Sequence, residues 1–181
     1  TDVRLEKTVA YPDGSPAFYF ARLRYVDNID EIFAAERAVR AVLQEGTVNI
    51  NGQEVGIRFS YLDAVSQSDT IRLIFDDDEY TYIKTLEDNP FIIELTYPLP
   101  VTVNGFSLII GSANIRVMLT ASGAPGAEPV TYTFEGKGSE NEPELSFDLP
   151  QPVNAQVLHI EVLDPFSPPP AQIHIWELTL R

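Results

Sequence analysis

Short apolar runs separated by turn residues fill most of the 181-residue sequence, and this pattern constrains the fold more than any other feature. Asn51-Gly52 is the strongest two-residue signal for a β-hairpin, and apolar residues alternate with polar ones on both sides of it. We predict further short strands at 70–75, 91–96, 106–110, 115–120, 130–134, 145–149, 157–162 and 173–180. Because no helical pattern lies between these runs, they predict an antiparallel β-sandwich rather than parallel βαβ units.

One segment alone has the spacing of a helix. Asn28 followed by Glu31 is a capping-box arrangement, and apolar residues then recur every three or four positions up to Leu43. Gly46 is the expected left-handed stop. We expect the apolar stripe of this helix to pack on a sheet; the alternative is a helix that binds a partner.

A break in the pattern near residues 60–69 divides the chain into two predicted parts. Residues 1–61 form a strand–helix–hairpin extension, and residues 62–181 form the sandwich. An extension of this size is only marginally stable by itself, so we expect it to pack on the sandwich.

The composition excludes several classes of function. The chain has 27 acidic against 12 basic residues and a net charge of -15, which argues against nucleic acid and other polyanions as partners. There is no Cys, no run of about 18 apolar residues that would insert into a membrane, and no zinc, serine-nucleophile or phosphate-loop motif. We therefore predict a non-catalytic protein. An acid-pair glycoside hydrolase stays open as an alternative, because such pairs leave no local signature.

Four consecutive acidic residues, 76–79, follow an apolar run and precede the aromatic segment Tyr80-Thr81-Tyr82. Their mutual repulsion would be relieved by a hard cation, and calcium takes carboxylate, carbonyl and hydroxyl oxygens. The alternative is a solvated turn in which the Asp side chains bond nearby N–H groups.

Several segments resemble one known family in order and spacing. Residues 70–85 (T-I-R-L-I-F-D-D-D-E-Y-T-Y-I-K-T), 89–95 (N-P-F-I-I-E-L), 101–110 (V-T-V-N-G-F-S-L-I-I) and 173–178 (I-H-I-W-E-L) are similar to strands and turns of galactose-binding-like domains. These domains are of the discoidin or coagulation-factor type C kind. The resemblance covers about residues 62–181 and leaves the N-terminal third unmatched.

The resemblance implies a mainly β fold, an antiparallel jelly-roll β-sandwich, that is non-catalytic and carries a structural calcium ion. It places the strand after the acidic turn beside the C-terminal strand. The positions that match metal ligands of the family are Asp76, Asp78, Thr81 and Glu177. Asp77 replaces the usual Gly, so it has to tolerate a positive φ, and Tyr82 replaces the usual Trp.

Aromatic residues in predicted loops are the candidate contacts for a sugar, because pyranose rings stack on aromatic faces. They are Tyr80, Tyr97 and Phe166, whereas Trp176 is interpreted as core. The predicted function is that of a carbohydrate-recognition or accessory module outside the cytoplasm, secreted or at the cell surface. Thr rather than Met at position 1 suggests a piece of a longer chain. The placement outside the cytoplasm rests on the resemblance, on this missing Met and on the absence of Cys. A structural or interaction domain without a small ligand is the alternative, and the sequence leaves the oligomeric state open.

Overall fold

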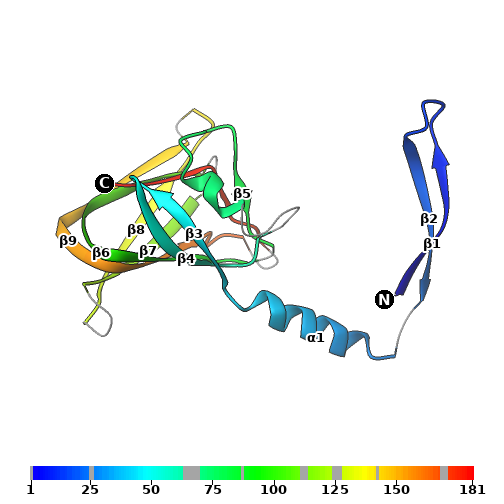
Figure 1. Cartoon of the computed structure of the whole chain (residues 1–181), viewed down its shortest axis with the longest axis horizontal. Helices are drawn as coiled ribbons and strands as arrows, with labels where there is room; N and C mark the ends of the chain where they lie inside the picture. The colour runs from blue at the N-terminus through cyan, green and yellow to red at the C-terminus, as the bar shows by residue number, and fades with distance from the viewer. Residues whose placement is uncertain are drawn as a thin grey trace. The chain divides into compact units, whose positions relative to one another are not determined.

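The computed structural model describes residues 2–24, 27–62, 70–86, 88–110, 114–123, 128–141, 143–167 and 171–181. The chain forms two compact units, Thr1–Arg40 and Ala41–Arg181 (Figure 1). The predicted boundary at residue 61 is therefore displaced, and most of the segment on which it rested, 63–69, lies outside the described residues. The physical reason is that the hairpin of β3 (Gln44–Ile50) and β4 (Gln53–Phe59) is hydrogen-bonded into the main sheet through β4 and β6.

The N-terminal unit contains an antiparallel hairpin and a helix. Strands β1 (Asp2–Ala10) and β2 (Pro16–Arg24) are joined by a tight turn, in which the Asp13 carboxylate accepts hydrogen bonds from the Ser15 N–H and hydroxyl. The sequence pattern had predicted one strand here, and not a hairpin.

The predicted helix is confirmed as α1 (Ile29–Arg40), and the Asn28 carbonyl accepts from the N–H groups of Glu31 and Ile32 in its first turn. Its predicted end was wrong. The helix ends at Arg40, and Gly46 lies in β3, where a Cβ atom would stand 3.7 Å from the side chain of Ile57. The part of the extension before β3, which includes α1, was also expected to pack on the sandwich, and this stays a prediction.

The second unit is an antiparallel β-sandwich, which confirms the predicted fold class. Its strands, besides β3 and β4, are β5 (Ile83–Lys84), β6 (Phe91–Ile109), β7 (Asn114–Ser122), β8 (Val130–Lys137), β9 (Glu144–Leu163), β10 (His174–Ile175) and β11 (Glu177–Leu180). The main sheet has the order β3-β4-β6-β9-β7-β8, with β11 paired to β6.

Strands β6 and β9 carry the chain from one layer to the other. The first half of β6 pairs with β4, and its second half pairs with β11, while β9 follows β6 along both halves. The register shifts between Thr96 and Val101 and again between Val103 and Gly105. Gly105 lies so close to β9 that a Cβ atom there would collide with the Phe147 carbonyl oxygen. These irregularities bend the two long strands, which the sequence analysis had divided into separate runs.

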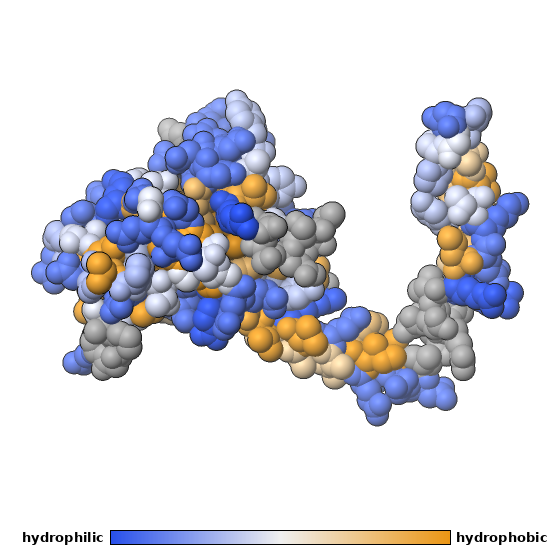
Figure 2. Space-filling view, in the orientation of Figure 1, coloured by the Kyte–Doolittle hydropathy of each residue, from blue (hydrophilic) through white to orange (hydrophobic). Residues whose placement is uncertain are grey.

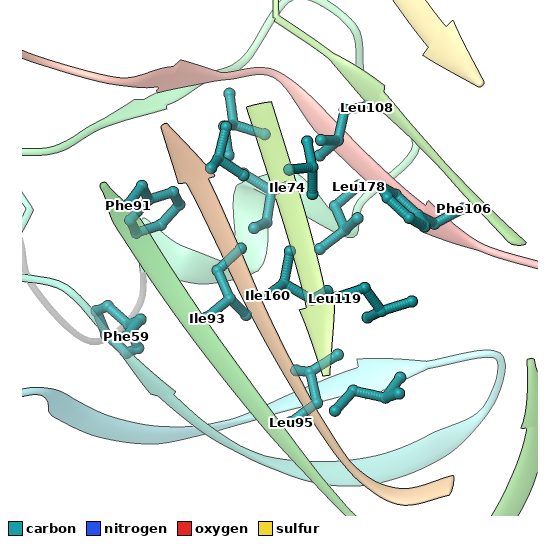
Figure 3. Close-up of a cluster of buried hydrophobic side chains, with 14 of the residues drawn as sticks. Phe59, Ile74, Phe91, Ile93, Leu95, Phe106, Leu108, Leu119, Ile160 and Leu178 are labelled. Atoms are coloured by element: carbon teal, nitrogen blue, oxygen red, sulfur yellow. The ribbon is translucent and has the colours of Figure 1, made fainter. Parts of the chain in front are cut away.

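The core lies between the layers. Side chains of β6, β7 and β9 gather there with Ile74 and Leu178, as Figure 3 shows. Phe106 is fully buried, and its ring contacts Phe134 edge-on and Phe147 at a tilt, with centroids 5.5 and 5.1 Å away.

Residues 70–75 form no strand, contrary to the prediction. Thr70–Ile74 is a 3-10 helix, η1, whose buried residues are Ile71 and Ile74. Their spacing of three matches the three-residue turn of this helix, so one face enters the core. η1 leads directly into the acidic residues 76–79.

The strand that follows the acidic turn lies beside the end of the chain, as expected. β5 pairs antiparallel with β10, so that Ile83 faces Ile175 and Lys84 faces His174. This short ladder brings residues about 90 positions apart into one region of the surface.

Candidate functional site

The acidic turn is a compact loop held by its own polar groups. The Asp76 carboxylate accepts from the Asp78 N–H at 3.0 Å and lies 3.4 Å from the Thr81 hydroxyl. The Asp78 carboxylate accepts from the Tyr80 N–H, while its carbonyl accepts from Thr81. Asp77 has φ 58°, the positive value expected because the family that this segment resembles has Gly at the matching position.

Glu177 reaches this turn from β11. Its residue is only 7% exposed, its carboxylate accepts from the Asp77 N–H, and its Oε2 atom has no hydrogen-bond partner among the described residues. Burial raises the pKa of Glu177 to about 7, and the charges of Asp77, Asp76 and Glu79 add to the effect. An unpartnered buried carboxylate oxygen beside three other acids is a costly arrangement.

These residues fit a hard cation in part. In the described part of the chain, no three His, Asp or Glu side chains are placed to enclose a metal ion by themselves. Calcium, however, accepts backbone carbonyl and hydroxyl oxygens as well as carboxylates. The structure brings Asp76, Thr81 and Glu177 to one region, whereas the Asp78 carboxylate is turned toward the Tyr80 N–H.

The three aromatic residues predicted to contact a ligand have different surroundings. Tyr80 is 95% exposed in the acidic turn, and Phe166 is 76% exposed in a turn after β9. Tyr97 is 4% exposed within β6, and burial raises its pKa to about 12. The prediction of Tyr97 as a loop aromatic was wrong, because this residue lies within β6 and its side chain belongs to the buried core.

The structure instead places an aromatic cluster beside a pocket. The rings of Tyr82, His174 and Trp176 lie with their centroids 5.1 to 6.2 Å apart. His174 and Trp176 also line a pocket of about 190 Å³, together with Asp164, Gln172 and the apolar side chains Ile110, Ile115 and Ile173. An aromatic face with a few polar groups around a small cavity is typical of sites that bind small ligands.

The electrostatics of this pocket are set by two of its residues. Burial and the nearby charge of Lys84 lower the pKa of His174, so its imidazole is neutral near pH 7. Burial tends to raise the pKa of Asp164, but hydrogen bonds from Ser167 and from the Phe166 N–H outweigh burial and lower it. The pocket therefore combines a neutral imidazole with an ionised carboxylate.

Asp164 also fixes the loop that carries Phe166. Its carboxylate accepts from the Phe166 and Ser167 N–H groups, and from the Ser167 hydroxyl at 2.6 Å. The Asn89 side chain donates to the Asp164 carbonyl and accepts from the Asp164 N–H. The loop is thus ordered by side chains from two distant parts of the sequence, up to Ser167; residues 168–170 of the predicted Pro-rich loop lie outside the described residues.

Sequence reasoning missed this pocket because it placed Trp176 in the core. Ile173, Ile175 and Glu177 point inward, which leaves the alternate residues 172, 174 and 176 on the outer side. Glu177 and Leu178 are both buried, so the alternation changes phase between β10 and β11. Counting backward from Leu178 and Leu180 therefore assigns Trp176 to the wrong face. The pattern 172–176 taken alone would have indicated the outer side.

Comparison with protein families and curated proteins finds no family model and no curated protein that matches this chain. Solved structures do share its fold. A family 32 carbohydrate-binding module of Clostridium perfringens in complex with galactose superimposes with a TM-score of 0.53 at 12% identity, over 70% of this chain and 92% of the module. A chitosan-binding module from a Paenibacillus chitosanase/glucanase superimposes with a TM-score of 0.52 at 15% identity, over 76% of this chain and 98% of the module.

A GH29 fucosidase of Ruminococcus gnavus in complex with fucose also matches, with a TM-score of 0.54 at 12% identity. This chain spans only 25% of that enzyme, and the match covers 70% of this chain. At these identities the likeness shows a common fold. The sandwich shares the fold of these modules, which agrees with the fold that the sequence resemblance implied.

Proposed function

We propose that the sandwich is a non-catalytic carbohydrate-binding module and that its ligand binds in the pocket beside Trp176. One observation carries the proposal: the half-buried indole lines a pocket of about 190 Å³ next to exposed polar side chains. The fold shared with carbohydrate-binding modules supports it. We further propose that the module acts outside the cytoplasm as part of a larger protein. None of the described helices is long and apolar enough to span a membrane.

A sugar would be recognised here by stacking and hydrogen bonding together. The apolar face of a pyranose ring packs on Trp176, which Tyr82 supports from the side with its ring centroid 5.1 Å away. Gln172 and His174 offer donors and acceptors to the hydroxyl groups, and a neutral imidazole has one of each. The wall formed by Ile110 and Ile115 excludes water from one side. The size of the pocket suits one sugar residue at the end of a glycan.

The acidic surface narrows the class of glycan. Asp164 lines the pocket, and the acidic turn begins six residues before Tyr82, so a sulfated or uronic acid ligand would be repelled. The first candidates are galactose, which is neutral, and glycans of glucosamine, whose amino groups are neutral or positively charged. Both are ligand chemistries of the structurally similar modules.

Calorimetric titration with galactose, fucose and chitosan oligosaccharides tests the proposal. Trp176→Ala is expected to weaken binding about 5-fold or more, because stacking on one aromatic ring contributes about 1 kcal/mol or more. Tyr11→Ala, which removes an exposed aromatic ring from the N-terminal unit, is the matched control and should leave the affinity unchanged. Binding that survives Trp176→Ala would place the ligand elsewhere. A blank glycan array would favour the structural or interaction domain.

We also propose that a structural calcium ion ties the acidic turn to Glu177. Asp76, Thr81 and Glu177, with backbone carbonyls of the turn, are the donors, and the unpartnered Glu177 Oε2 supports the assignment. Calcium would neutralise the charges that raise the pKa of Glu177. Adding calcium is expected to raise the melting temperature and a chelator to reverse the change. An unaltered melting temperature would contradict the proposal.

A further inference from the structure

A second pocket lies at the other end of β11 from Trp176. It has a volume of about 200 Å³, close to that of the pocket beside Trp176, and the two share no residue. Trp176 directly precedes β11 and Leu180 ends it, a span of up to roughly 13 Å along the strand. The other walls come from the β3–β4 turn, from the middle of β6 and from Arg181, so we name it the Arg181 pocket.

Tyr97 is a wall of the Arg181 pocket and has a buried hydroxyl without a partner. The residue is 4% exposed, and its hydroxyl makes no hydrogen bond in the part of the chain that the structure describes. Burial raises the pKa of this hydroxyl to about 12, so it keeps its proton and remains a donor. A buried hydroxyl without a hydrogen bond is costly. An acceptor atom of a ligand in the pocket would remove that cost.

Of the described residues that line this pocket, Arg181 alone has a charged side chain. Its Nη2 atom donates to the Phe147 carbonyl at 3.2 Å and to the Asp148 carboxylate at 2.9 Å. Its backbone N–H donates to the Gly105 carbonyl at 2.9 Å, so both the backbone and the guanidinium are held in place. The Asp148 side chain is largely exposed, which makes the ion pair weak, and the Nε and Nη1 donors have no partner among the described residues. These donors are available to an anion.

The turn between β3 and β4 brings two amide side chains to the pocket. The Asn49 side-chain oxygen accepts from the Gly52 N–H at 3.0 Å, which fixes the turn. Asn51 and Gln53, on either side of Gly52, line the pocket, and their side-chain amides make no hydrogen bond within the described ranges. Each amide can donate to a ligand oxygen and accept from a hydroxyl group. The pocket therefore offers donors to a carboxylate, and both donors and acceptors to hydroxyl groups.

The charge of this pocket differs from that of the rest of the sandwich. The sandwich unit contains six basic and 20 acidic residues, a net charge of -14, and Figure 2 shows hydrophilic residues over much of its surface in that view. Asp164 lines the pocket beside Trp176, and Asp77 and Glu177 line an adjoining pocket of about 260 Å³. No acidic side chain is among the described residues that line the Arg181 pocket. An anionic group is therefore repelled from the other two pockets and attracted to this guanidinium.

We propose that the Arg181 pocket binds a uronic acid, a sugar of one residue that carries a carboxylate. The carboxylate accepts from Arg181, and the sugar hydroxyls pair with the Tyr97 hydroxyl and with the amides of Asn51 and Gln53. The sugar acid that is repelled from the pocket beside Trp176 is accepted here, so this inference does not depend on the site proposed above. The net charge of the sandwich opposes an anion at long range, but about 0.15 M salt screens this repulsion beyond about 8 Å.

Titration of the nitrogen-15-labelled full chain with glucuronate, followed by NMR in about 0.15 M salt, tests the inference. The chain has one Trp, so the indole N–H signal of Trp176 reports on its own pocket, while the side-chain amide signals of Asn51 and Gln53 report on the Arg181 pocket. Glucuronate should shift the amide signals and leave the indole signal unchanged. Glucuronamide, which has the same ring without the charge, should bind about 10-fold more weakly or worse.

Two variants test the assigned contacts. Arg181→Gln should weaken glucuronate binding about 10-fold or more, because charge-assisted hydrogen bonds are lost. Tyr97→Phe removes only the hydroxyl and should weaken binding about 3-fold or more. Its melting temperature should not fall, because this hydroxyl makes no hydrogen bond to a described residue. The matched control is Arg116→Gln, which removes a cation that pairs with Glu135 at 2.8 Å on β7 and β8 and should leave the affinity unchanged.

Three results would overturn the proposal. Amide signals that do not shift up to about 10 mM glucuronate would mean that the pocket takes only solvent. Equal affinities for glucuronate and glucuronamide would remove the role of the guanidinium. A shift of the Trp176 indole signal that persists in Arg181→Gln would place the acid in the other pocket. Galactose that fails to bind beside Trp176 would contradict the site proposed above and leave this inference standing.

Discussion

The replacement Glu177→Gln tests how the acidic turn and β11 are held together. Gln keeps the acceptor for the Asp77 N–H and nearly the same shape, but it removes the negative charge. Without calcium, the buried carboxylate of Glu177 faces the charges of Asp76, Asp77 and Glu79 and has an unpartnered Oε2 atom. We therefore expect the variant to be more stable than the wild type in a chelator at about pH 8.

The size of the expected gain in stability follows from the raised pKa of Glu177. Burial and the neighbouring acids raise the pKa of Glu177 from 4.5 to about 7, and at about 1.4 kcal/mol per pKa unit this amounts to roughly 3 kcal/mol. The neighbouring acidic residues are exposed to solvent, which screens their charges, so about half of this figure, near 1.5 kcal/mol, is a realistic gain. For a domain of this size that corresponds to roughly 3–6 °C in melting temperature.

The raised pKa of Glu177 also fixes how the stability difference between Glu177→Gln and the wild type changes with pH. A carboxyl group whose pKa is raised by folding holds its proton more tightly in the folded state. Its destabilising effect is therefore absent below about pH 4.5, grows as the pH rises to 7, and is complete above 7. The difference between Glu177→Gln and the wild type should vanish at about pH 4.5 and be largest at about pH 8.

Differential scanning calorimetry at these two pH values, in calcium and in chelator, measures the effect. Calcium should raise the melting temperature of the wild type at about pH 8 and leave Glu177→Gln unchanged. The control is Glu54→Gln, which removes one charge from an exposed position on β4 and should change neither response. If Glu177→Gln melts at or below the wild-type temperature in chelator at about pH 8, the electrostatic reasoning is refuted. A calcium response that persists in this variant would remove Glu177 from the proposed ligands.

Two further substitutions probe the sandwich. Phe106→Ala removes a fully buried ring that contacts Phe134 and Phe147, and it should cost about 3–5 kcal/mol of unfolding free energy, measured by urea denaturation; a loss below about 1 kcal/mol would contradict the packing described. Asp77→Asn keeps a residue that tolerates φ 58° but removes a charge facing Glu177, so in chelator it should raise the melting temperature by roughly 2–4 °C at about pH 8 and not at about pH 4.5. An equal change at both pH values would mean that backbone strain, and not charge, dominates.

Much of the architecture could be predicted because its signals are local. Alternation of apolar and polar residues on both sides of Asn51-Gly52 correctly predicted the β3–β4 hairpin, and the Asn28 cap correctly predicted the start of α1. The errors also have local causes. Residues 70–75 look apolar enough for a strand, but the buried pair Ile71 and Ile74 is three positions apart, which a 3-10 helix satisfies better.

The candidate site was predictable only in part. We expected Glu177 to lie close to the acidic turn. The charges of the turn raise the pKa of Glu177, which agrees with this expectation. The pocket beside Trp176 was not expected, because its walls come from three separate parts of the chain: Ile110 with Ile115, Asp164, and residues 172–174 with Trp176. No short motif joins these segments, and the phase of a strand can change within one residue, as it does between Glu177 and Leu178.

The sequence by itself determined that the chain is an acidic, mainly β protein with one helix, because strand alternation, turn residues and charge are properties of neighbouring positions. Tertiary structure alone decided which faces of the strands point outward. In the folded chain Tyr97 is buried, Trp176 is partly exposed, and Glu177 lies under the acidic turn. These outcomes depend on the register between strands far apart in the chain. A shift of one residue exchanges the inner and outer faces, so register had to be known before the site could be assigned.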